Sequence, residues 1–210
     1  MVVSAHYFKS SALIENFKQS KFLIISTCIL IFGMLFGALS IVLLKDGLLK
    51  FVNDCFYEYL SFRSNAKFFK IFFASFCSGI FYIFVITISS FGLSGFAVTP
   101  LLLFLRGFST CALTGILYKN FSLQGIAFSN LILLPSSLCV DFILIFLSND
   151  AFQLSAKFAS IFKDVSFKGI DVKPTCTKLL RSCLICVVAL SFASCIEAVF
   201  SAGFIKYFNF

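Results

Sequence analysis

Residues 97–118 read AVTPLLLFLRGFSTCALTGILY, an apolar stretch with a single charge, Arg106, near its middle. At 1.5 Å per residue, a helix of this length spans the hydrocarbon core of a bilayer, which is about 30 Å thick. A charged side chain at that depth costs several kcal/mol unless it is paired or hydrated. The stretch therefore predicts a transmembrane helix, and Arg106 is its first candidate site residue.

The composition of the whole chain is that of an integral membrane protein. Of its 210 residues, 60% are hydrophobic and 12% are charged, a balance foreign to soluble globular domains. Open strand edges would leave backbone groups unpaired in lipid, so the spans are expected to be helices. We predict an all-α, polytopic helical bundle.

Several apolar runs are long enough to cross the bilayer core. Five spans are predicted, over residues 22–44, 71–91, 97–118, 124–147 and 182–205. The third and fourth are joined by a tight turn at 119–123, which makes them antiparallel neighbours. All five belong to one bundle domain covering residues 22–205.

Apolar side chains at helical intervals also predict two amphipathic helices at the membrane surface, over 47–70 and 151–168. A helix packed flat on the bundle is the alternative for both. Residues 1–21 are predicted to be a cytoplasmic tail, since the inner segments then hold nine Lys and Arg against seven outside. Residues 206–210 form the C-terminal tail. The basic flanks favour anionic lipid headgroups, not nucleic acid, as partners, and the expected location is the cell membrane.

Three ionisable residues fall within the predicted spans: Arg106, Asp141 and Glu197. Position 136 should lie level with Arg106, which places Asp141 about 7.5 Å further along the axis, within reach of the guanidinium. Glu197 is expected either to complete a three-member network with this pair or to extend toward the outer interface. The network would fix the packing of the bundle; the competing interpretation is a path for a proton or solute.

Small residues and helix breakers predict where helices pack closely or bend. Gly33 and Gly37 form a G-x-x-x-G pattern, and Gly79 lies on a small-residue face of the second span. These faces serve either contacts within the chain or the docking of another protein's helix. The motif and kink positions are Gly92, Gly95, Pro100, Gly107 and Pro135. The short, apolar connection around Gly92 and Gly95 is expected to dip into the membrane.

The motifs argue against catalysis by the chain itself. Gly92-Leu93-Ser94-Gly95 matches the short G-x-S-G motif of rhomboid-type intramembrane proteases, but a nucleophilic serine needs a neighbouring base. The only histidine, His6, lies in the N-terminal tail. Since zinc-protease and phosphate-loop motifs are also absent from the sequence, we expect no catalytic residues, no cofactor and no metal.

The sequence resembles the stage II sporulation protein M family of endospore-forming bacteria from about residue 22 to the end. The resemblance rests on Phe91-Gly-Leu-Ser-Gly to Pro100, Leu103-Phe-Leu-Arg106-Gly107-Phe-Ser109, the 119–123 turn, Leu134-Pro135 and Ile196-Glu197-Ala198. It implies a non-enzymatic membrane component of forespore engulfment. The implied role is to anchor and localise two peptidoglycan-degrading partners, stage II sporulation proteins D and P, at the division septum.

Two other functions remain open from the residues. A small permease or flippase would use Arg106 to recognise an anionic solute. A general envelope membrane protein would have no role in sporulation. Transport measurements and the timing of expression distinguish these alternatives from a scaffold.

Overall fold

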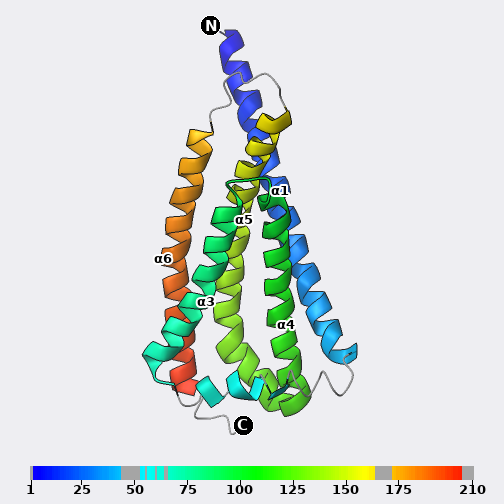
Figure 1. Cartoon of the computed structure of the whole chain (residues 1–210), viewed down its shortest axis with the longest axis vertical. Helices are drawn as coiled ribbons and strands as arrows, with labels where there is room; N and C mark the ends of the chain where they lie inside the picture. The colour runs from blue at the N-terminus through cyan, green and yellow to red at the C-terminus, as the bar shows by residue number, and fades with distance from the viewer. Residues whose placement is uncertain are drawn as a thin grey trace.

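The computed structural model describes residues 2–43, 53–54, 56–59, 61–63, 66–163 and 172–204. All secondary structure in these ranges is helical. The main elements are α1 (Val2–Leu43), α3 (Phe68–Ser89), α4 (Gly95–Phe128), η1 (Ser129–Leu133), α5 (Leu134–Lys163) and α6 (Lys173–Phe204). Figure 1 shows them as one elongated bundle, with the long helices running roughly along its longest axis.

The predicted all-α membrane fold is confirmed. Four helical stretches of the described chain are long and apolar enough to cross a membrane: Lys21–Leu43, Phe68–Ser89, Gly95–Ile161 and Lys173–Gly203. Their outward surfaces carry exposed apolar side chains, among them Ile24, Phe81, Phe142, Leu184 and Val188. Such a surface is unfavourable in water and suits contact with lipid. The chain is therefore a multi-pass helical membrane protein.

The third of these stretches contains a sharp reversal at Ser122, where φ is 47° and ψ is −122°. Helices on either side of it are antiparallel, α4 descending and α5 returning beside it in Figure 1. A Cβ added to Gly125 would lie 2.1 Å from the carbonyl oxygen of Leu117, so only glycine allows this close return. The reversal confirms the turn predicted at 119–123.

The predicted kink at Pro135 is preceded by a widened helical turn. Proline has no backbone N–H to donate to the preceding turn, so regular α-helical bonding is interrupted there. The chain adopts a π-helix over Ser129–Leu133, directly before Leu134 and Pro135. Such turns commonly mark bends in helices.

The described part of the predicted helix over 151–168 is the end of α5 and packs on the bundle, which was the stated alternative to a surface helix. α5 continues without a break to Lys163, and Ala151, Phe152 and Leu154 are buried in the bundle. The polar residues that ended the predicted span are themselves buried: Ser148 donates to Ser26, and Asp150 pairs with α6. Satisfied hydrogen bonds let the helix run on. Residues 164–168 lie outside the described residues.

The predicted helix over 47–70 does not continue to residue 70, because residues 66–67 are not helical. Helical residues occur at 53–54, 56–59 and 61–63, then residues 66–67 leave the helix and α3 begins at Phe68. Phe56 is buried in a core cluster with Ile41, Leu117 and Phe128. The described part of this segment therefore packs on the bundle, which was the stated alternative. Residues 47–52 lie outside the described residues.

Glycines let the helices approach within backbone contact. A Cβ added to Gly33 or Gly37 would lie 2.3 Å from the carbonyl oxygen of Phe104 or Phe108, respectively, in α4. In return, a Cβ at Gly107 would lie 2.3 Å from the oxygen of Leu30 in α1. The G-x-x-x-G face of α1 thus serves an intramolecular contact. Gly79 of α3 similarly receives Leu190 of α6.

Candidate functional site

Arg106 lies on the face of α4 that turns toward α5. Its neighbour Gly107 packs against α1, and successive helix positions are about 100° apart, so the two residues face different helices. The Arg106 Nε donates to Oδ1 of Asp141 at 3.2 Å. The guanidinium carbon lies 5.9 Å from the centre of the Tyr82 ring, within cation–π range. The predicted pairing of Arg106 with Asp141 is confirmed.

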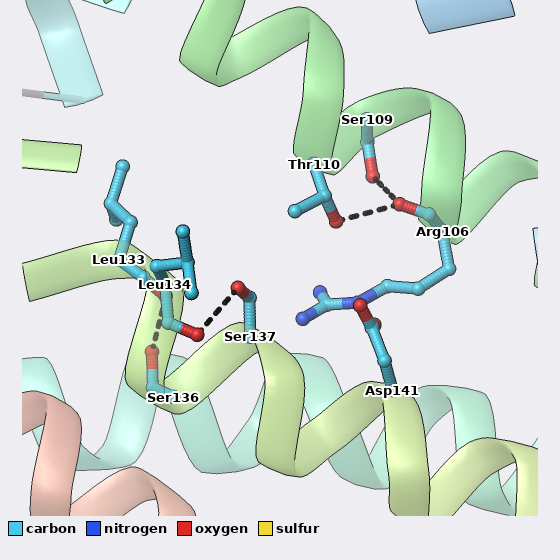
Figure 2. Close-up of polar contacts among 8 residues, drawn as sticks. All are labelled: Arg106, Ser109, Thr110, Leu133, Leu134, Ser136, Ser137 and Asp141. Atoms are coloured by element: carbon cyan, nitrogen blue, oxygen red, sulfur yellow. Dashed lines mark hydrogen bonds and ion pairs between the residues drawn. The ribbon is translucent and has the colours of Figure 1, made fainter. Parts of the chain in front are cut away.

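The pair is largely withdrawn from the surface. The exposed fraction is 19% for the Arg106 side chain and 5% for that of Asp141. Figure 2 shows the guanidinium beside the end of the Asp141 side chain, with its terminal nitrogens directed toward Ser137. These two Nη atoms have no hydrogen-bond partner among the described residues, and Oδ2 of Asp141 is also buried without one.

Glu197 has a different partner from the one predicted. Its Oε1 pairs with the Nη2 of Arg63, and its Oε2 accepts a hydrogen bond of 2.6 Å from Ser75. Arg63 also donates from Nη1 to the Ser201 hydroxyl at 3.2 Å. A direct three-member network of Arg106, Asp141 and Glu197 is therefore wrong. The structure contains two separate carboxylate–guanidinium pairs instead.

Arg63 is the residue that sequence reasoning missed. It lies within the amphipathic helix predicted over 47–70 and follows Phe56 by seven residues and Tyr59 by four, so all three fall on one helical face. That face points into the bundle, where Arg63 is buried and its guanidinium carbon lies 4.8 Å from the centre of the Tyr59 ring. The periodicity of the segment was a signal that could have placed it.

Burial shifts the pKa values of Arg63 and of the neighbouring Tyr59. The pKa of Tyr59 is raised by burial, an effect that the nearby cations Arg63 and Arg106 partly offset. The pKa of Arg63 is lowered by burial, and the proximity of Tyr59 opposes that change. In both cases the surroundings disfavour the charged form. Pairing with Glu197 is the contact that compensates the buried charge of Arg63.

Both guanidinium groups line one cavity of about 360 Å³. Its walls come from α3, α4, α5, the segment ending at Arg63, and Glu197 of α6. The polar lining residues are Tyr59, Arg63, Ser75, Ser78, Arg106, Ser109, Thr110, Thr114, Ser136, Ser137 and Glu197. Asp141 lies beside the cavity through its bond to Arg106. Arg106 and Glu197 are thus brought to one site, although they do not pair with each other.

The bundle interior also holds an apolar core. A core cluster that includes Leu103 of α4, Leu144 of α5 and Leu190 of α6 fills the bundle interior, and each of these side chains is at most 1% exposed. A second polar group lies further along α5, where Asp150 accepts from Ser182 at 2.6 Å and pairs with Lys178 at 2.8 Å. This pair was also missed, because Asp150 was placed outside the fourth span.

The connection between α3 and α4 is a tight turn. Gly95 begins α4 where an added Cβ would lie 2.0 Å from the Ser155 hydroxyl of α5, so a side chain there would displace that hydroxyl. Gly92 has room for a side chain, and Pro100 lies within α4. Ser94 donates to the carbonyl of Ser89 at 3.1 Å, a bond that stabilises the turn.

The arrangement of guanidinium groups, carboxylates and hydroxyls is suited to binding and positioning polar groups. In the described part of the chain, no three His, Cys, Asp or Glu side chains gather as a metal site would need. The strongest chemical feature is the pair of buried guanidinium groups beside hydroxyls. Comparison of the chain with protein-family models, with characterised proteins and with solved structures found no match.

Proposed function

We propose that this chain is a non-enzymatic membrane scaffold that positions other proteins. The single observation that carries the proposal is the way in which the helices are cross-braced. Arg106 joins α4 to α5, Arg63 joins the segment before α3 to α6, and backbone contact at Gly33 holds α1 against α4. A body held by buried ion pairs and close-packed backbones keeps a fixed shape. A fixed shape is what a positioning protein needs.

The partners in this proposal are peptidoglycan-degrading enzymes at the septum during forespore engulfment, stage II sporulation proteins D and P. Their identity rests on the family resemblance. The surface proposed for their contact is the segment that ends at Arg63. It exposes the adjacent residues Tyr57 and Glu58 and, four positions further on, Phe62, while the buried side chains of Phe56 and Arg63 anchor it. Aromatic side chains of this kind are frequent in protein interfaces.

Co-purification from sporulating cells tests the scaffold directly. The tagged chain should recover both wall-degrading partners, and a strain lacking the chain should stall in engulfment when its membranes are stained. Tyr57→Ser with Phe62→Ser should lower partner recovery without lowering the amount of the chain. Arg181→Ser, an exposed change on α6 away from this segment, is the matched control. Absence of both partners together with normal engulfment would refute the proposal.

The alternative of a permease or flippase is less well supported. A transported solute needs a path through the bundle, and the buried leucines beyond Arg106 (Leu103, Leu144 and Leu190) occupy the interior. Reconstitution into liposomes tests it. Uptake of a labelled anionic solute above that of empty liposomes, abolished by Arg106→Met, would favour transport over the scaffold.

A further inference from the structure

The guanidinium group of Arg106 supplies hydrogen-bond donors to the cavity that it lines. The Arg106 Nε is used by Asp141, while the two terminal nitrogens carry donors that no described residue accepts. Figure 2 shows them reaching past Asp141 toward Ser137. A planar guanidinium with free terminal N–H groups matches the oxygens of a phosphate or carboxylate.

The hydroxyl groups around the cavity offer the opposite chemistry. Ser109 and Thr110 donate their protons to the carbonyl of Arg106, and Ser136 and Ser137 donate to the carbonyls of the residues three positions earlier. A hydroxyl has one proton and two lone pairs. These side chains therefore present acceptor oxygens to the cavity, and the Glu197 carboxylate, whose Oε2 already accepts from Ser75, keeps lone pairs that add to them.

The charges at the cavity cancel. Arg63 and Arg106 carry two positive charges, and Asp141 and Glu197 carry two negative charges. A ligand with a net charge would leave the buried site unbalanced, which is costly at low dielectric. A ligand that carries one charge of each sign preserves the balance and matches both the donors and the acceptors.

The size and access of the cavity suit such a ligand. Its volume of about 360 Å³ lies in the range of small-molecule sites, about 300–1,000 Å³. Ser109 is exposed and Ser137 is half-buried, so the cavity reaches the molecular surface beside them. This surface belongs to helices that also expose apolar side chains, such as Leu105 and Leu138.

We propose that the cavity binds a zwitterionic amino-phosphate group. The phosphate accepts from the terminal nitrogens of Arg106, and the protonated primary amine donates to the surrounding hydroxyl oxygens and to Glu197. Two sources carry this chemistry: the headgroup of an ethanolamine phospholipid within the membrane, and free glycerophosphoethanolamine, which is also a phosphate diester, in solution. The cavity shares Phe62 with the partner-binding surface of the proposed scaffold, but lipid binding and partner recovery are measured separately, so each can fail without the other.

Native mass spectrometry of the delipidated, detergent-purified chain tests the binding. The probes are short-chain phospholipids with ethanolamine, choline or glycerol headgroups. The ethanolamine lipid should bind at least tenfold more tightly than the choline lipid, which has the same charges but no N–H donor, and more tightly than the anionic glycerol lipid. Equal binding of the ethanolamine and choline lipids, or tighter binding of the glycerol lipid, would overturn the proposal.

Competition with free glycerophosphoethanolamine identifies the source. If millimolar glycerophosphoethanolamine displaces the lipid and glycerophosphocholine does not, the headgroup alone is recognised. If neither displaces it while headgroup selectivity holds, the ligand is the lipid. Both results support the amino-phosphate site. Displacement by glycerophosphocholine as effective as that by glycerophosphoethanolamine would count against it.

Variants separate recognition from folding. Arg106→Lys keeps a cation beside Asp141 but removes the terminal nitrogen pair that binds the phosphate, so binding of the ethanolamine lipid should fall at least tenfold while the chain stays folded. Ser137→Ala removes a cavity oxygen and should weaken ethanolamine binding several-fold with choline binding unchanged. Ser191→Ala, which removes the same kind of helix-internal bond outside the cavity lining, is the control. Unchanged binding of the ethanolamine lipid in both cavity variants would overturn the assignment.

Discussion

Replacing Arg106 by methionine should destabilise the bundle strongly, because it leaves Asp141 as an unpaired buried carboxylate. Asp141 is 3% exposed, and its Oδ2 already lacks a hydrogen-bond partner among the described residues. Removing one member of a buried ion pair costs about 3–5 kcal/mol. Protonating the carboxyl would remove the unpaired charge, at a cost of about 4 kcal/mol at pH 7 for an aspartic acid with a reference pKa near 3.9. The two figures agree.

This loss is measurable by thermal unfolding in detergent and by the amount of chain in the membrane. At roughly 2–4 °C per kcal/mol for a chain of this size, the midpoint should fall by about 10 °C. The double variant Arg106→Met with Asp141→Leu removes both charges, so most of the loss should be recovered. A single variant as stable as the parent, or a double variant no better than the single one, would refute the reasoning.

Three further predictions follow from the packing and the second ion pair. Gly107→Ala should lower the free energy of unfolding by about 1–3 kcal/mol, because the added Cβ would push α1 away from α4. Gly203→Ala is the control and should be neutral or slightly stabilising, since a Cβ there meets nothing within 4 Å. Equal effects of the two substitutions would contradict the contact between α1 and α4. Arg63→Met should lower the free energy of unfolding by about 3–5 kcal/mol, and Glu197→Gln should lower it by less, since glutamine keeps a hydrogen bond. If Arg63→Met left the stability unchanged, the pair would not be buried. Because burial raises the pKa of Tyr59, the folded state holds its proton more tightly than the unfolded state, and stability should fall as pH rises through about 10. Tyr59→Phe should reduce that fall in a pH series of unfolding midpoints, and an unchanged slope would contradict the shift.

The membrane fold was predictable because hydropathy and length act locally. The run around Arg106 has to be helical in lipid wherever its neighbours lie, and the pairing with Asp141 followed from one short turn and the rise per residue. The relative depth of two residues on neighbouring antiparallel helices can therefore be predicted from the sequence. The turn itself was placed at 119–123, and the chain reverses at Ser122 within it.

Contacts between distant segments were not readable in the same way. Arg63 and Glu197 are 134 positions apart and belong to helices whose relative rotation is set by packing, so sequence could place each on a face but could not join them. The continuation of α5 through Asp150 was missed for a related reason. In the sequence, the polar cluster around Asp150 resembles the end of a helix. Only the structure shows that Ser182 and Lys178 of α6 contact the Asp150 carboxylate inside the bundle.

The central claim is that Arg106 is neutralised within the membrane by the carboxylate of Asp141. Solid-state NMR on the chain in lipid, with ¹⁵N-labelled arginine and ¹³C-labelled aspartate carboxyls, measures this contact directly through dipolar dephasing. The structure predicts strong dephasing of one arginine Nε signal, consistent with the 3.2 Å separation of Nε from Oδ1, and its loss in Asp141→Asn prepared with the same labels. An Arg106 Nε signal that shows no dephasing from any aspartate carboxyl would contradict the account.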